Sequence, residues 1–385
     1  MKIVVLGGSG EMGRVICTDL AETFKGEIVI ADRNKSKADA FAKSFKSRRI
    51  RGARIDANDV DSFNDELNGA NVLINSANYY VNLLAMQGAL ANNVHYIDLG
   101  GLYHMTLKQL KLNSKFKKKN LLAILGCGST PGITNIMAGH YAKGFETIDS
   151  IDIQFADRDY TKYNMPFMLP YSLDTLYDEF SMRPAVFKNK KHIFTDPISG
   201  SIGVNFPKPI GLKSCFYTLH SEVATLPNTF KDRGIKECSF RGGFDREFVD
   251  KIKFLIDMGF SSREQIEIED KKITPRRLSV MLMNRFVPNS STKFNDIELL
   301  RVDISGMQNG KSKRIVAYCK AKTNKKHNIP AGAWDTGVPP SIIAQMIANN
   351  KIDYTGVLPS ELAIPSDLFF SELKRRDMVV FARNK

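Results

Sequence analysis

The sequence predicts an α/β protein with a Rossmann-type, doubly wound parallel sheet and an inserted α+β domain whose sheet is mixed and largely antiparallel. Over the first ~130 residues, short apolar runs alternate with amphipathic helical patterns, which is typical of βαβ units. A glycine-rich turn follows the first apolar run. From about residue 148, longer runs alternate polar with apolar residues, as in strands with one solvated face.

The strands predicted for the first domain are rich in Val, Ile and Leu, which indicates burial on both faces of a parallel sheet. They cover residues 2–6, 27–31, 51–55, 71–75, 95–97 and 121–125. Helical patterns lie between them at 11–24, 35–45, 59–67, 83–91 and 106–118. We expect residues 1–132 and 333–385 to form the dinucleotide-binding domain.

The second domain is expected over residues 133–332, as a substrate-binding and dimerisation domain. Its predicted strands are 150–155, 236–241, 297–304 and 314–320, and its predicted helices are 172–180, 246–258 and 275–286. A late helix, 339–348, should pack back on the Rossmann domain at the domain junction. A homodimer formed through the second-domain sheet is expected.

Composition excludes several classes of protein. Hydrophobic residues make up 43% and charged residues 25%, as in globular proteins, and no apolar run has the ~20 residues that cross a membrane. The net charge is +14, but the basic runs lack interleaved aromatic residues, so nucleic acid is not an expected partner. No cysteine pair has C-x-x-C spacing, which argues against a zinc site and favours reduced thiols in a cytoplasmic protein.

The sharpest motif is a dinucleotide-binding fingerprint between the first strand and the first helix. It reads Gly8-Ser9-Gly10-Glu11-Met12-Gly13. Gly8 permits a tight turn, Gly10 lets the backbone approach a pyrophosphate, and Gly13 allows close packing of helix on strand. The helix N-terminus then offers N–H groups to the phosphates.

The second strand ends at Asp32, in the position where a carboxylate accepts hydrogen bonds from the adenosine ribose. This favours NAD, but Arg33, Lys35 and Lys37 follow and suit the 2′-phosphate of NADP, so both cofactors stay open with NAD favoured. Asp56, after the third strand, is a candidate for the adenine edge or for capping the next helix.

Further candidate residues lie at the ends of later strands, because ligands bind beyond the carboxyl ends of parallel strands. They are Ser76, Ala77, Tyr80, His95, Asp98 and Ser129. Asp98 is the first candidate for proton transfer and Tyr80 the second. His95 is the third, because it begins its strand and is therefore expected at the end remote from the ligand. The alternatives are that Asp98 caps a turn and that His95 is an ordinary buried histidine.

Polar residues in apolar surroundings mark the second domain. His220, Ser221 and Arg241 are candidates for holding a substrate carboxylate, since a guanidinium matches that group. The alternative for Arg241 is a structural ion pair.

Taken in order, these segments resemble the saccharopine dehydrogenase family. The resemblance rests on residues 4–13, 31–33, 95–101, 126–135, 172–180, 184–191, 220–227, 240–260 and 336–346. It implies a Rossmann domain completed by the C-terminal tail, and hydride transfer at the C–N bond of lysine, saccharopine or a related carboxylated amine through an imine. It also implies that Arg241 meets the substrate carboxylate. A carboxynorspermidine-type polyamine dehydrogenase, and a dinucleotide sensor without catalysis, are the alternatives.

Overall fold

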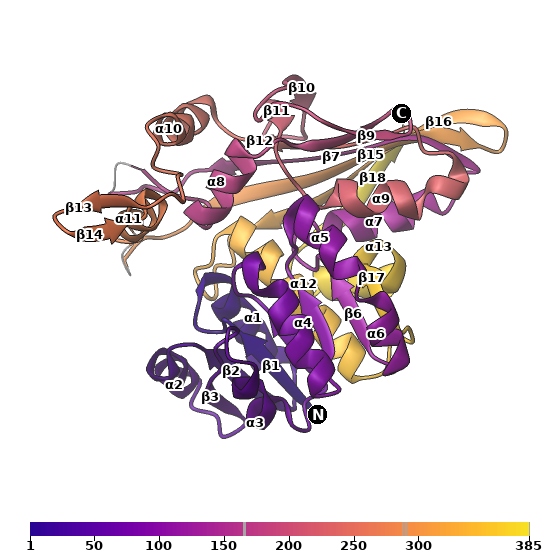
Figure 1. Ribbon diagram of the computed structural model, residues 1–385. Helices are drawn as coiled ribbons and strands as arrows, with labels where there is room; N and C mark the ends of the chain where they lie inside the picture. The colour runs from indigo at the N-terminus through magenta and orange to yellow at the C-terminus, as the bar shows by residue number, and fades with distance from the viewer. Residues whose placement is uncertain (165–166, 287, 289–290, 385) are drawn as a thin grey trace.

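The computed structural model describes residues 1–164, 167–286, 288 and 291–384. Figure 1 shows two stacked parts: the Rossmann domain below, and a long, twisted mixed sheet above it. The fold class expected from the sequence is confirmed.

The sheet of the Rossmann domain is parallel throughout and runs in the order β17-β6-β5-β4-β1-β2-β3. The direction of winding reverses between β1 and β4, and ligands bind beyond the strand ends at such a point. The strands are β1 Lys2–Leu6, β2 Glu27–Asp32, β3 Ile50–Arg54, β4 Val72–Asn75, β5 His95–Asp98, β6 Leu122–Leu125 and β17 Gly356–Pro359.

Helices cover both faces of this sheet, as the nearly uniform burial of its strands requires. The pattern at 106–118 was predicted as part of one helix but forms two, α5 and α6. The helices are α1 Glu11–Thr23, α2 Lys35–Ser44, α3 Asn64–Leu67, α4 Asn82–Ala91, α5 Leu102–Leu110, α6 Asn113–Lys118, α12 Ala331–Ala348 and α13 Ser360–Ala363. Two further helices, α7 Ile133–Ala142 and α14 Ser366–Lys374, contact strands of the second sheet instead.

The second sheet runs in the order β10-β11-β12-β7-β15-β16-β18, and β8 and β9 extend from β12. Only the pairing of β12 with β7 is parallel among those the structure describes. The strands are β7 Thr147–Asp159, β8 Ala185–Lys188, β9 Lys191–Phe194, β10 Ile202–Asn205, β11 Leu212–Tyr217, β12 Glu237–Gly243, β15 Asp296–Gln308, β16 Lys311–Lys322 and β18 Val379–Asn384.

The C-terminal tail is shared between the two sheets. Helix α12 contacts α1 and β16, and β17 pairs with β6 in the Rossmann sheet. The last strand, β18, instead pairs with β16 in the mixed sheet. The expectation that all of 333–385 belongs to the Rossmann domain is therefore wrong for this strand, because β16 offers it an open edge.

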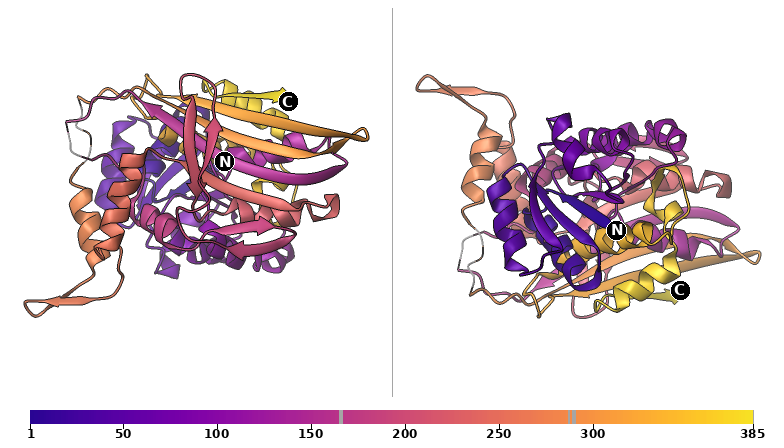
Figure 2. Two further views of the ribbon diagram at one scale, coloured as in Figure 1. Left: turned by 90° about the horizontal axis from the view of Figure 1, so that it is seen from above. Right: turned by 90° about the horizontal axis from the view of Figure 1, so that it is seen from below.

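The remaining elements belong to the second domain. They are helices α8 Leu173–Ser181, α9 Glu222–Thr229, α10 Arg246–Asp257 and α11 Pro275–Met283, and the hairpin β13 Ile266–Ile268 with β14 Lys271–Ile273. Helices α10 and α11 and the hairpin project from the body of the molecule (Figure 2). Helix α8 packs against α10 and α11 and lies next to the mixed sheet (Figure 1).

All five cysteines are buried and free. Within the described part of the chain, none of the helices combines the length and the apolar character that crossing a bilayer demands.

Candidate active site

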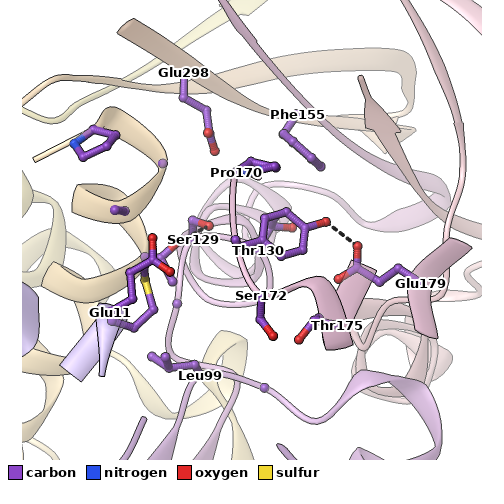
Figure 3. A pocket seen from close by; sticks show the side chains of 18 of the residues that line it. Glu11, Leu99, Ser129, Thr130, Phe155, Pro170, Ser172, Thr175, Glu179 and Glu298 are labelled. Carbon is purple, nitrogen blue, oxygen red and sulfur yellow. Dashed lines mark hydrogen bonds between the residues drawn. The ribbon is translucent and has the colours of Figure 1, made fainter. Parts of the chain in front are cut away.

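A cavity of about 540 Å³ lies between the two domains. Its floor is formed by the loops that follow β4, β5 and β6, together with the start of α1. Its walls are formed by α8, the ends of β7 and β15, and the start of α12. Figure 3 shows side chains from both domains pointing into this space. A second, more open groove beside the glycine-rich loop is lined by Ser9, Gly10 and residues 32–37.

The glycine-rich loop has the geometry that a dinucleotide requires. A Cβ at Gly8 would lie 2.8 Å from the carbonyl oxygen of Val5, and one at Gly13 would lie 2.2 Å from that of Gly7, so both are fixed by packing. A Cβ at Gly10 would meet only one neighbouring atom, at 3.1 Å, and Gly10 lines the groove. The space beside Gly10 at the start of α1 therefore fits a pyrophosphate.

Other predicted cofactor residues also line these spaces. Glu11, Met12, Ser76 and Ala77 line the central cavity, so the floor next to the helix N-terminus is accessible to the nicotinamide half of a bound dinucleotide.

Asp32 and Arg33 line the groove, where the adenosine half would bind. The Asp32 carboxylate accepts hydrogen bonds from the Ser9 hydroxyl at 2.5 Å and from the backbone N–H of Asn34 at 2.9 Å. Asp56 lines neither space. Its carboxylate accepts a bond from the N–H of Asn58 at 3.1 Å, so it caps a turn before the next helix, which agrees with the second of its two predicted roles.

We expect Asp32→Ala to shift cofactor preference towards NADP. The carboxylate repels a 2′-phosphate, whereas Arg33 and Lys37 in the same groove attract one. The measurement is kcat/KM with each cofactor, and the NADP/NAD ratio should rise about tenfold or more. An unchanged ratio would show that Asp32 does not contact the ribose.

Tyr80 lies outside the cavity, so its predicted catalytic role is not supported by its position. Its hydroxyl donates to the carboxylate of Asp178, and Arg263 lies over its ring. The preceding residue, Tyr79, lines the cavity and also donates to Asp178, at 2.7 Å. Arg276 pairs with the other oxygen of Asp178 at 2.8 Å. These contacts join the Rossmann domain to α8 and the projecting helices.

Asp98 is fully buried and does not line the cavity, which corrects its prediction as the proton-transfer group. One carboxylate oxygen accepts bonds from the N–H groups of Gly126 at 2.9 Å and Gly100 at 3.0 Å. The other accepts from Gln109 at 2.6 Å and Tyr96 at 3.1 Å. Burial raises the pKa of Asp98, and these donors partly offset the increase. Asp98 therefore fixes the two loops that form the cavity floor.

We expect Asp98→Asn to reduce stability rather than the rate of the folded enzyme. An amide would turn N–H groups towards the donors of Gln109 and Tyr96. The unpaired buried donors should cost about 1–3 kcal/mol in the free energy of unfolding, measured by urea titration. Asp61→Asn, on the exposed surface, is the control. A strong loss of kcat at unchanged stability would restore the catalytic role of Asp98.

His95 is at the amino end of β5, remote from the strand ends that form the cavity floor. Its Nδ1 accepts a hydrogen bond from the backbone N–H of Leu122 at 3.0 Å, and burial lowers its pKa. His95 is therefore a packed structural histidine, and its prediction as a catalytic residue is corrected.

Arg241 lies on the face of the mixed sheet turned away from the cavity. Its guanidinium lies over the ring of Tyr217, with 4.1 Å from Cζ to the ring centroid, and contacts Ser239 at 2.8 Å. Its predecessor Phe240 faces the other way and stacks on His220. Adjacent residues of a strand point to opposite faces of the sheet. Phe240 therefore takes the face towards the cavity and Arg241 the other face, so the prediction of Arg241 as the carboxylate anchor is corrected.

His220, Ser221 and Ser129 line the cavity. The Nδ1 of His220 lies 2.7 Å from the Glu222 carboxylate, and its Nε2 lies 3.8 Å from the carboxylate of Glu179. Burial lowers the pKa of His220, but the charges of Glu222 and Glu179 more than offset this and raise it overall. His220 thus lies between two carboxylates, which favour its protonated form.

Glu179 was missed in the sequence. Helix α8 positions its carboxylate at the cavity wall, where it accepts a hydrogen bond from the Tyr171 hydroxyl at 2.5 Å, drawn as the dashed line in Figure 3. Burial raises its pKa to about 7, partly offset by His220 and by the bond from Tyr171. A carboxyl group with this pKa is able to exchange protons near neutral pH.

The cavity wall is strongly acidic. Of the described residues that line it, none is Lys or Arg, and the carboxylates are Glu11, Asp157, Asp159, Glu179, Asp245, Asp296 and Glu298. Lys213 pairs with Asp245 at 2.5 Å from behind the wall. The sequence does contain a sign of this acidic wall. Asp157 and Asp159, and likewise Asp296 and Glu298, are two positions apart, and residues i and i+2 of a strand lie on the same face.

The chain matches two family models over nearly its whole length. Residues 3–124 match the saccharopine dehydrogenase NADP binding domain, and residues 128–379 match the saccharopine dehydrogenase C-terminal domain. A carboxyaminopropylagmatine dehydrogenase of Synechocystis is 24% identical, over 97% of this chain and 95% of its own. A carboxynorspermidine synthase of Vibrio alginolyticus is 20% identical, over 93% of this chain and 91% of its own.

Two solved structures share the fold across the whole chain. Apo saccharopine dehydrogenase (L-Glu forming) of Saccharomyces cerevisiae superposes with a TM-score of 0.76 at 14% identity and covers 100% of this chain and 99% of that one. Homospermidine synthase of Legionella pneumophila, solved with NAD, gives a TM-score of 0.67 at 13% identity over 100% and 91% of the two chains. With both of its domains matched, this chain is an NAD(P)-binding oxidoreductase that belongs to the saccharopine dehydrogenase family.

Proposed function

We propose that this protein catalyses NAD(P)-dependent hydride transfer at a C–N bond of a carboxylated polyamine. The observation that carries the proposal is the acidic cavity, in which carboxylates are the charged groups on the wall and Lys and Arg are absent from the described lining residues. Saccharopine carries three carboxylates and would meet repulsion in this cavity. A polyamine carries several ammonium groups and would be attracted.

The names of the two curated relatives support this choice, since both denote carboxylated polyamines. The sequence identities to these relatives are only 24% and 20%. Their names support the proposal because a polyamine substrate also agrees with the acidic charge of the cavity. An amino-acid substrate, which the family resemblance also implies, is the competing candidate.

The bound dinucleotide would supply the hydride acceptor or donor. In the oxidative direction, a carbon next to nitrogen loses a hydride, the nitrogen loses a proton, and water hydrolyses the resulting imine to an amine and a carbonyl compound. The reverse direction condenses these two and reduces the imine. Either direction needs a group that accepts or donates a proton beside the nitrogen.

Glu179 is the residue of this chain best suited to that proton transfer. Its carboxyl lines the cavity, its pKa is about 7, and His220 and Tyr171 hold it in place. In the oxidative direction, ionised Glu179 would accept the proton of the substrate amine. In the reductive direction, protonated Glu179 would donate it to the imine.

The substrate carboxylate needs donors, and a small group of them lies near His220. Ser221 lines the cavity, and its buried hydroxyl has no hydrogen-bond partner among the described residues. A buried hydroxyl without a partner is unfavourable and is satisfied when a ligand oxygen binds it. Ser221 and His220, whose protonated form is favoured by Glu222 and Glu179, would together hold one carboxylate.

The proposal is tested by absorbance at 340 nm with carboxynorspermidine, saccharopine and lysine, each with NAD and NADP. We expect turnover of the carboxylated polyamine, with kcat/KM about a hundredfold or more above that for saccharopine. A higher kcat/KM with saccharopine or lysine would overturn the proposed substrate class and leave the family assignment intact.

A further inference from the structure

Four carboxylates face one another at the ends of β7 and β15. The two strands are antiparallel, and their register places Asp157 directly opposite Glu298 and Asp159 directly opposite Asp296. All four side chains line the cavity. Directly opposed residues have Cβ atoms about 4.5–5.5 Å apart, and like charges at that distance are destabilising unless something compensates.

Both carboxylates of the outer pair, Asp159 and Asp296, accept hydrogen bonds from groups of the protein. Asp159 accepts hydrogen bonds from the Tyr163 hydroxyl at 2.5 Å and from the Thr161 N–H at 2.8 Å. Asp296 accepts from the N–H of Ala331 at 2.9 Å. These two carboxylates fix the ends of the strands and the start of α12.

The inner pair is different. Among the described residues no hydrogen bond to the carboxylate of Glu298 is formed, and this carboxylate points into the cavity on the side opposite Leu99 (Figure 3). Burial, with the charges of Asp157 and Asp296, raises the pKa of Glu298. Burial also raises the pKa of Asp157 to about 6, partly offset by Lys213. Lys213 therefore compensates the inner pair only in part, on the side of Asp157, and no cation lowers the pKa of Glu298.

A third carboxylate behind the pair gives independent support. Asp335, on α12, is completely buried, and neither of its carboxylate oxygens has a hydrogen-bond partner among the described residues. Burial, followed by the charges of Glu298 and Asp296, raises its pKa well above the usual range. A buried carboxylate without donors is costly, and a cation held beside Glu298 would lower that cost.

We propose that Asp157 and Glu298, with Asp335 behind them, bind the terminal cationic nitrogen of the substrate, at the end of the molecule remote from the reacting C–N bond. This inference rests on the proposed function and assigns the orientation of the substrate within the cavity. The carboxylate end lies at His220 and Ser221, and the ammonium end lies in the cavity against the paired ends of β7 and β15.

An organic cation fits these residues better than a metal ion. Among the residues that the structure describes, no group of three or more His, Cys, Asp or Glu side chains has an arrangement that could hold a metal. A cavity of about 540 Å³ has room for an extended polyamine. The distance between the two ends of the cavity would then select substrates by chain length.

The test is Glu298→Gln, measured by calorimetric titration with norspermidine and by steady-state kinetics with carboxynorspermidine. Norspermidine should bind about tenfold to a hundredfold more weakly, and KM for carboxynorspermidine should rise while kcat and KM for the dinucleotide stay near wild type. Asp157→Asn should do the same. The matched control is Glu267→Gln, on the exposed hairpin β13–β14, which should bind norspermidine like wild type.

Folding is checked by thermal melting. Glutamine removes a repelled charge, so the melting temperature of Glu298→Gln should be equal to or above that of wild type. Wild-type affinity for norspermidine in both variants would overturn the ammonium site alone. A wild-type protein that binds saccharopine and not norspermidine would overturn the proposed function and the ammonium site together.

Discussion

Glu179→Gln is expected to lower kcat about 10²–10⁴-fold, the usual effect of removing a proton-transfer group. Glutamine keeps the size of the side chain and its ability to accept the hydrogen bond from Tyr171, but it cannot exchange a proton. The affinity for the dinucleotide should not change, because Glu179 lies on α8, away from the glycine-rich loop.

The pH profile separates this role from a structural one. With a pKa of about 7, Glu179 is protonated below neutral pH and ionised above it. The rate of amine oxidation should therefore rise with pH through about 7, and the rate of imine reduction should fall over the same range. Glu179→Gln should lose this titration in both directions.

Stability provides the control for this variant. The native pKa of Glu179 exceeds the value of 4.5 for an unperturbed glutamate, so its ionisation lowers the stability of the fold as pH rises through about 7. Glutamine mimics the protonated form, so the variant should be at least as stable as wild type at pH 8. A kcat within a few-fold of wild type, with the titration near pH 7 retained, would assign proton transfer to another group.

Gly10→Val is expected to abolish dinucleotide binding while the chain still folds. Gly10 has φ −75° and ψ 176°, an extended conformation that valine adopts readily. A Cβ there would lie 3.1 Å from the nearest neighbouring atom, the carbonyl oxygen of Gly7, so the loop needs only a small adjustment. The branched side chain would occupy the space where the pyrophosphate approaches the backbone.

Isothermal titration with NADH and NADPH measures this effect. The dissociation constants should rise about a hundredfold or more, which corresponds to roughly 2.7 kcal/mol. Gly203→Val, on the exposed strand β10 of the other sheet, is the matched control and should bind both cofactors normally. Unchanged affinity in Gly10→Val would show that the dinucleotide does not bind at this loop.

The sequence alone determined the fold class and the cofactor loop. Local patterns are sufficient here: buried parallel strands have continuous apolar runs, and the fingerprint from Gly8 to Gly13 needs only a strand before it and a helix after it. His220, Ser221 and Ser129, which the sequence predicts as substrate-binding residues, line the cavity, and their binding role stays a prediction.

Only the tertiary structure decided the chemistry of the wall. Asp98 and Glu179 are both acidic residues in apolar surroundings, yet one is enclosed by the backbone N–H groups of neighbouring loops and the other faces the cavity. That difference depends on which elements pack around each carboxylate, and packing partners distant in sequence are not encoded in a local pattern.

The sequence also did not determine the register and the pairing of the strands in the second sheet. Arg241 and Phe240 are neighbours in a strand, and the face that each one takes follows from pairing of β12 with β7. Likewise, Asp157 and Glu298 are 141 positions apart and become direct neighbours only through the register of β7 with β15. The acidic wall therefore exists only in the folded chain, because its charges come from strands that pair after long stretches of intervening sequence.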